Sequence, residues 1–149
     1  MRITMKLSDY RVYPVTAIDG DGNGIYTISI DGIPGATTEA RENKIDEWAL
    51  AAFVDISEAR LQRHQIVPAA PRPKEGQRTL TVPVVTAMKV MLWSAMNERG
   101  ITRAELARRL GVIPQSVVQL FSLSRKNSSV ETLVRAFEAI GMTVEFTAE

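Results

Sequence analysis

Apolar residues recur at helical spacing on both sides of Gly111. Steps of three and four residues place each set on one helix face, and a glycine can adopt the positive φ that ends the first helix. Residues 102–122 are therefore predicted to form two short helices joined by a tight turn, with the second offered to the DNA major groove. A plain helical hairpin within a bundle is the alternative. The apolar positions are Leu106, Ala107, Leu110, Val112, Val117 and Leu120.

The first part of the chain shows the two-residue alternation of β-strands. Residues 10–17 and 25–31 alternate on either side of the sequence DGDGNG at residues 19–24, which is rich in turn-forming residues, so a hairpin is expected. Pro14 indicates that the first strand lies at a sheet edge or carries a bulge. Further short strands could form at residues 35–38, 66–67 and 78–82.

Helical periodicity predicts one long helix over residues 38–63, with an apolar stripe that packs on the sheet. Trp48 and Phe53 are expected to be core residues rather than parts of a binding site. His64, the single histidine, follows this helix. The stripe comprises Ile45, Trp48, Ala49, Ala52, Phe53 and Ile56.

A second helix is predicted over residues 83–99, with Pro83 in its first turn and Gly100 at its end. Apolar residues left over outside its buried stripe, including Trp93, make its exposed side a candidate dimer surface. The predicted stripe comprises Val85, Met88, Leu92, Ala95 and Met96.

Capping residues mark the next helix starts. Thr102 followed three positions later by Glu105 forms a capping-box pattern, and Ser129 can cap a helix over residues 130–140. Residues 142–146 then alternate like a short strand and are a second candidate dimer surface.

Charge is distributed unevenly along the 149 residues, although the net charge is only +1. Residues 1–85 carry ten basic and eleven acidic side chains, whereas residues 89–127 carry seven basic and two acidic ones. Positive charge is thus concentrated on the predicted two-helix segment and its flanks, where phosphates would lie. We expect two domains, residues 1–82 with linker strands around residues 66–82, and residues 83–149.

Candidate catalytic and metal-binding residues are few. The chain has no cysteine, and a lone His64 without a matched nucleophile is weak support for catalysis. Asp19, Asp21 and Asn23 partly follow a calcium-loop pattern, but Ile30 stands where the bidentate glutamate belongs, so a solvated hairpin turn is expected. A two-metal nuclease site built from Asp19, Asp21 and Asp31 would lack a carboxylate on the helix that faces the sheet.

These observations predict a non-enzymatic protein without a cofactor or bound metal. The N-terminus lacks the apolar region of a signal peptide, and no stretch is apolar enough to span a bilayer, so we expect a cytoplasmic protein without a membrane partner.

Several segments together resemble HicB-type antitoxins of toxin–antitoxin pairs. They are YPVT, GIYTISIDGIP, QIVPAAP and TVPVVTAMKVMLWSAM, followed by ITRAELARRLG and SSVETLVRAFEAIGM, which resemble the DNA-binding domain of lambda-repressor-like regulators. The similarity covers roughly residues 10–141, and Gly32 departs slightly from the usual turn of the family.

The resemblance implies an α+β protein with two functions. A small antiparallel sheet with one long helix, a partial ribonuclease-H-like fold, would bind and cover a HicA-type mRNA-cleaving toxin. An all-α helix-turn-helix domain would bind operator double-stranded DNA, as a homodimer or higher homo-oligomer, and repress the operon. The alternative is a free-standing helix-turn-helix regulator with a ligand-sensing N-terminal domain.

Site residues follow from the predicted second helix and its flanks. Gln115 and Gln119 are the predicted base readers because an amide can bond adenine in a bidentate manner. Arg108 and Arg109 could contact DNA or belong to a solvated helix face. The full predicted DNA-binding set is Arg103, Gln115, Ser116, Gln119, Ser124, Arg125, Lys126 and Asn127.

Overall fold

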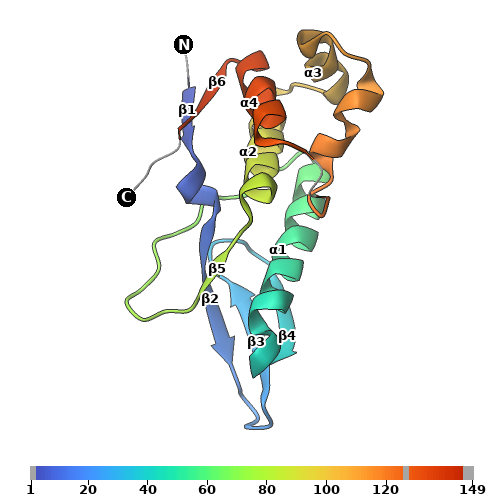
Figure 1. The fold of residues 1–149 in the computed structure, drawn as a ribbon. Helices are drawn as coiled ribbons and strands as arrows, with labels where there is room; N and C mark the ends of the chain where they lie inside the picture. The colour runs from blue at the N-terminus through green and yellow to red at the C-terminus, as the bar shows by residue number, and fades with distance from the viewer. Residues whose placement is uncertain (1–2, 126–127, 146–149) are drawn as a thin grey trace.

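A computed structural model of the chain describes residues 3–125 and 128–145. The fold is α+β, as predicted, with a four-stranded antiparallel sheet, one long helix and a largely helical C-terminal half (Figure 1). The strands are β1 (Ile3–Lys6), β2 (Val12–Ile18), β3 (Ile25–Ile30), β4 (Thr37–Arg41), β5 (Thr79–Thr81) and β6 (Met142–Glu145). The α-helices are α1 (Ile45–Gln62), α2 (Val84–Arg99), α3 (Arg103–Leu110) and α4 (Val130–Ala139), and the 3₁₀ helices are η1 (Leu7–Tyr10), η2 (Glu42–Lys44) and η3 (Pro114–Phe121).

The sheet has the strand order β4-β3-β2-β5, and it contains the predicted β2–β3 hairpin. The register pairs Val15 with Ile30 and Ala17 with Ile28, which puts both isoleucines on the face covered by α1 (Figure 1). Asp19 closes the hairpin turn, since its carboxylate accepts hydrogen bonds from the backbone N–H groups of Asn23 and Gly24 at 3.2 and 3.0 Å.

The prediction of a helix from residue 38 is wrong for residues 38–41, and residues 42–44 form the 3₁₀ helix η2 rather than part of the α-helix. Residues 37–41 form β4, which pairs with β3, and α1 begins only at Ile45. The β-branched Thr37 and Thr38 favour a strand, and pairing with β3 satisfies backbone groups that a free helix end would leave open. The third strand expected at residues 35–38 is therefore real but lies two to three residues further along the chain.

The inward face of α1 is narrower than predicted, and Trp48 is not part of it. Phe53 is fully buried, with its ring 5.0 Å from that of Tyr13, whereas Trp48 is 49% exposed. The buried residues recur every four positions, and Trp48 precedes the nearest of them by one, which is about 100° around the helix. The buried residues of α1 are Ile45, Ala49, Phe53, Ser57 and Leu61.

The α2 helix is buried on all sides along most of its length, which corrects the prediction of an exposed side. Every residue from Thr86 to Met96 is buried, and Trp93 is only 5% exposed. Val85, predicted in the stripe, is half-buried. The neighbours of α2 account for this burial: the C-terminal end of α1, the segment after η3, and η1 all contact it, and α4 lies beside it (Figure 1). A helix surrounded in this way needs apolar residues all round rather than one stripe.

The two ends of the described chain lie together. β6 pairs in parallel with β1, so Ile3 is opposite Met142 and Lys6 is opposite Glu145 (Figure 1). Of the other expected strands, residues 79–81 form β5, whereas residues 66–67 do not form a strand. Val67 is instead buried, and its backbone N–H donates to Ser94 Oγ of α2 at 3.1 Å.

A buried lysine fastens the segment after η3 to α2. The Lys89 side chain is fully buried, and its Nζ donates to the carbonyl oxygens of Ser122 and Arg125 at 2.9 and 2.6 Å. Thr86 Oγ1 adds a hydrogen bond to the Leu123 carbonyl oxygen at 3.4 Å. Burial lowers the pKa of the Lys89 ammonium, and the charge of Arg125 lowers it further. The segment 122–125 is thereby held by donors from a single helix.

We predict that Lys89→Met lowers the free energy of unfolding by about 1–3 kcal/mol, because two carbonyl oxygens lose their donor while the apolar stem is kept. Urea denaturation measures the effect. Lys44→Met is the matched control, since that side chain is 56% exposed and forms a surface ion pair with Glu47, and a change below about 0.5 kcal/mol is expected.

The effect of Lys89→Met on the free energy of unfolding should also depend on pH. A lowered pKa means that Lys89 releases its proton earlier in the folded than in the unfolded chain, so stability rises as pH increases toward the unfolded value near 10.5. The stability gap between the unaltered chain and Lys89→Met should therefore widen over that interval. An equal loss in both lysine variants would contradict the role of Lys89.

Candidate nucleic-acid interface

Helix α3 begins and ends at the residues that the sequence singled out. Thr102 Oγ1 accepts the backbone N–H of Glu105 at 3.1 Å, which confirms the N-cap. Gly111 ends the helix in the left-handed conformation with φ +71°. Ile113 is extended, and Pro114 opens η3. Two short helices with a tight turn therefore occupy residues 103–121, as the apolar spacing indicates.

The second of these helices is a 3₁₀ helix over Pro114–Phe121 rather than the α-helix expected over residues 113–122. Its faces are nevertheless those predicted. Val117 and Leu120 are buried, and Gln115, Ser116 and Gln119 are exposed. Side chains three residues apart eclipse one another in a 3₁₀ helix, and the spacing of Val117 and Leu120 fits that winding.

The tighter winding also aligns residues that the sequence interpretation missed. Gln115 lies in line with Val118, and Ser116 with Gln119, because each pair is three residues apart. Val118 is 51% exposed and Ile113 is 64% exposed. The outer surface of η3 thus combines amides and a hydroxyl with apolar side chains. A three-residue period, applied to residues 113–121, is the signal that could have identified these positions.

Arg103 lies over two aromatic rings at the junction of α2, α3 and η3. Its guanidinium carbon is 4.5 Å from the centre of the Phe121 ring and 5.1 Å from that of Trp93. The two rings meet edge to face, with centroids 5.4 Å apart and an interplanar angle of 85°. Stacking of this kind orders an arginine while its N–H groups stay available at the edge of the plane. The Arg103 side chain is exposed.

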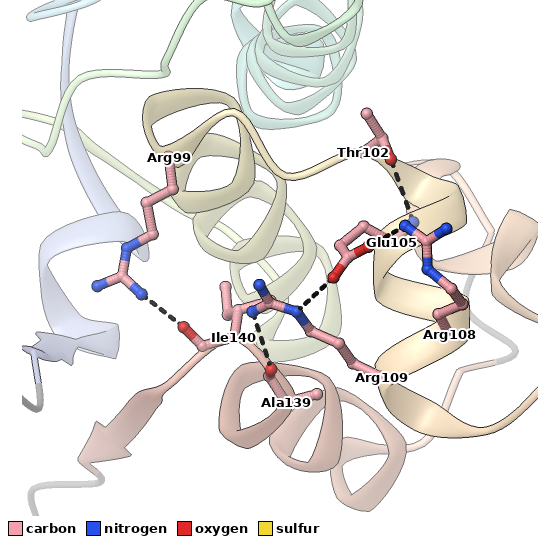
Figure 2. Close-up of polar contacts among 7 residues, drawn as sticks. All are labelled: Arg99, Thr102, Glu105, Arg108, Arg109, Ala139 and Ile140. Atoms are coloured by element: carbon pink, nitrogen blue, oxygen red, sulfur yellow. Dashed lines mark hydrogen bonds and ion pairs between the residues drawn. The ribbon is translucent and has the colours of Figure 1, made fainter.

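Three other arginines in this region are used within the molecule (Figure 2). Arg99 Nη1 donates to the Ile140 carbonyl oxygen at 2.5 Å, and Arg109 Nη1 donates to that of Ala139 at 3.3 Å. Both guanidinium groups lie at the C-terminal end of α4, where unpaired carbonyls carry partial negative charge. Arg109 Nε also donates to Glu105 Oε1 at 3.1 Å, and Arg108 forms an ion pair with the same carboxylate.

The Glu105 carboxylate does not complete the capping box that the sequence predicts. It does not return to the Thr102 backbone but faces the two arginines of its own helix (Figure 2). Hydrogen bonds from Arg108 and then Arg109 hold the pKa of the Glu105 carboxyl below its usual value. Several of the cations counted between residues 89 and 127 therefore have partners within the fold, although Arg108 and Arg109 stay exposed, as Arg103 and Arg125 do.

The remaining predicted site residues follow η3. Ser124 and Arg125 are exposed on the segment that Lys89 and Thr86 hold against α2. Lys126 and Asn127 lie outside the described residues. The structure thus brings Ser124 and Arg125 to the end of η3, while Arg103 lies against Phe121, its last residue.

The acidic residues considered for a metal site lie apart. Asp19 and Asp21 precede β3, whereas Asp31 follows it at the other end. Asp31 accepts hydrogen bonds from Thr16 Oγ1 at 3.0 Å and Gln77 Nε2 at 2.8 Å. Within residues 3–125 and 128–145, three or more His, Cys, Asp or Glu side chains never gather closely enough to hold a metal ion. None of the helices in these ranges has the length and apolar character needed to cross a membrane.

Comparison with known proteins identifies the family to which the chain belongs. No protein-family model matches the sequence. Antitoxin HicB 1 of Photorhabdus laumondii is 33% identical over 139 residues, which cover 92% of this chain and 86% of the relative. Antitoxin HicB of Pseudomonas fluorescens is 34% identical over 113 residues, which cover 74% of this chain and 73% of the relative. Antitoxin HicB of Escherichia coli K12 is 28% identical over 130 residues, which cover 87% of this chain and 93% of the relative. The chain belongs to the HicB antitoxin family.

Proposed function

We propose that this antitoxin neutralises a HicA-type mRNA-cleaving toxin and represses its own operon by binding operator DNA through α3 and η3. The observation that carries the DNA-binding part is the exposed face of η3. Gln115, Ser116 and Gln119 project from a short helix whose opposite face, Val117 and Leu120, is buried. A short helix with one buried and one polar face, preceded by a second helix and a tight turn, has the form that enters a major groove.

Base recognition would combine two kinds of contact. The amides of Gln115 and Gln119 can bond adenine N6 and N7, and the exposed Val118 and Ile113 can contact thymine methyl groups. Phosphates on either side would be held by Arg103, ordered on its aromatic rings, and by Arg125, with Ser124, Lys126 and Asn127 assisting. Two copies would read a palindrome with half-sites about 34 Å apart, so we propose a homodimer or a higher homo-oligomer on DNA.

Toxin binding, rather than catalysis, would be the task of the sheet and α1. Asp19 and Asp31, which a nuclease would need as metal ligands, lie at opposite ends of β3 and bond the hairpin turn and Gln77 respectively. The names of the relatives also favour an antitoxin over the alternative of a ligand-sensing regulator. A toxin that cleaves mRNA must bind a polyanion, so an acidic partner surface would speed association.

The double substitution Gln115→Ala, Gln119→Ala should abolish preference for the operator while leaving weak nonspecific DNA binding. Each bidentate amide–base pair contributes about 1–3 kcal/mol, so operator affinity should fall at least tenfold, on the order of the loss of one pair. Fluorescence anisotropy with operator and scrambled duplexes at one salt concentration measures the change. Gln62→Ala, an exposed glutamine on α1, is the matched control. Unchanged operator preference in the double variant would show that η3 is not the reading helix.

Toxin neutralisation is tested by adding the full chain to a purified HicA-type toxin. Stoichiometric addition of the chain should stop RNA cleavage by that protein. The Gln115→Ala, Gln119→Ala variant should inhibit equally well, because its altered residues lie on η3 and outside the sheet and α1. Undiminished cleavage in excess antitoxin would contradict the proposed function.

A further inference from the structure

Trp48 lies on the surface of the antitoxin without a place in the core. Its indole is 49% exposed, beside a hollow of about 300 Å³ between α1 and β4. Small side chains, Ala51 and Ala52, and the half-buried Ile56 continue the wall of this hollow along α1, and Thr37 and Thr38 line it from β4. We call this surface the Trp48 groove.

The groove lies at an edge of the sheet. The strand order β4-β3-β2-β5 leaves the outer side of β4 without a neighbouring strand among the described residues. Unpaired strand edges offer backbone donors and acceptors to a partner, and an adjacent hollow can receive its side chains. A large aromatic residue beside such an edge is the kind of side chain that anchors protein interfaces, because tryptophan buries much area with few rotatable bonds.

Charge indicates which partner the groove fits. Residues 37–58, which comprise β4 and most of α1, carry six acidic and two basic side chains in a chain whose overall charge is +1. Asp55 lines the groove, and Glu39 is exposed on β4. Glu47 and Asp46 are paired with Lys44 and Arg78 at 3.2 Å each. A cationic protein surface complements this composition.

We propose that the Trp48 groove is the docking surface for the toxin, with Trp48 as the anchor and Asp55 among the steering charges. The proposal depends on the proposed function for the identity of the partner, since an RNA-cleaving protein carries a cationic substrate face. Engagement of β4 and Trp48 by that face would place antitoxin over the RNA-binding surface and exclude RNA. The acidic β2–β3 hairpin turn is another candidate surface for a cationic partner, so the turn is tested separately.

The first test measures toxin affinity by calorimetry with the full chain and a catalytically inactive HicA-type toxin. Trp48→Ala should weaken binding at least thirtyfold, about the effect of losing one interface hot spot. Ile18→Ala is the matched control, because Ile18 is 59% exposed on β2 of the same sheet. Both variants should keep the melting temperature and operator affinity of the unaltered chain.

The second test concerns charge. Asp55→Lys should slow association with the toxin several-fold at low salt, with a smaller effect at high salt, because steering is screened. Asp21→Lys, an equal charge change in the exposed hairpin turn, should alter association much less. The opposite ranking would move the docking surface to the turn and overturn the proposal.

The third test observes Trp48 directly. The chain contains two tryptophans, so antitoxin labelled with 5-fluorotryptophan gives two fluorine resonances. The half-exposed Trp48 should show a solvent-isotope shift that unlabelled toxin removes, whereas the resonance of Trp93, 5% exposed, should change little. Loss of that shift on concentrating the antitoxin alone would assign the groove to a second copy of the chain and overturn the proposal.

The outcomes distinguish failure of the Trp48 groove from failure of the proposed antitoxin function. Toxin binding that Trp48→Ala retains would overturn the groove and leave the antitoxin function standing. Absence of toxin binding by the unaltered chain would overturn the proposed function and the groove with it.

Discussion

Burial of α2 on all sides is the constraint on which the rest of the structure depends. Eleven consecutive residues, Thr86–Met96, are buried, so every element around this helix must supply a matching surface. Polar residues on α2 are tolerated only where they have partners. Ser94 accepts the Val67 N–H, and Lys89 donates to two carbonyl oxygens beyond η3. Each polar contact fixes a segment that has no regular secondary structure of its own.

The same helix connects the two halves of the molecule. Asn97 Nδ2 donates to the carbonyl oxygens of Leu61 and Gln65 at the end of α1, at 2.9 and 2.8 Å. Trp93, one turn earlier, packs edge to face on Phe121 of η3. Because Trp93 and Asn97 are four residues apart, one stretch of α2 meets both α1 and η3. The sequence predicted the helix, but a single-stripe pattern could not reveal that both of its faces are covered.

Local signals in the sequence were reliable where local chemistry decides the structure. Thr102, Ser129, Gly100 and Gly111 cap or end helices as predicted, because these positions depend on neighbouring backbone groups. The β2–β3 hairpin follows from alternation and a turn of Asp, Gly and Asn. Prediction failed where the structure depends on contacts between segments that are distant in the sequence. Residues 38–41 form a strand because β4 pairs with β3, and Trp48 lies outside the core because the sheet contacts only one face of α1.

Counting basic residues along the sequence overstates the charge available for binding when some of those side chains form hydrogen bonds or ion pairs within the fold. Arg99 and Arg109 lie at the carbonyl end of α4, Arg108 pairs with Glu105, and Lys89 is buried. Their positive charges contribute to the field around α3 and η3, and part of their hydrogen-bonding capacity is used within the fold. Within the described residues, Arg103 and Arg125 are exposed without such an ion pair, which is why the proposed phosphate contacts are assigned to them. Most acidic side chains of β4 and α1 are exposed, and β4 and the first turns of α1 lie at the end of the molecule away from α3 (Figure 1). In the proposed function, opposite charge at two separate surfaces would let one chain attract a polyanion and a polyanion-binding protein without the two competing for the same residues.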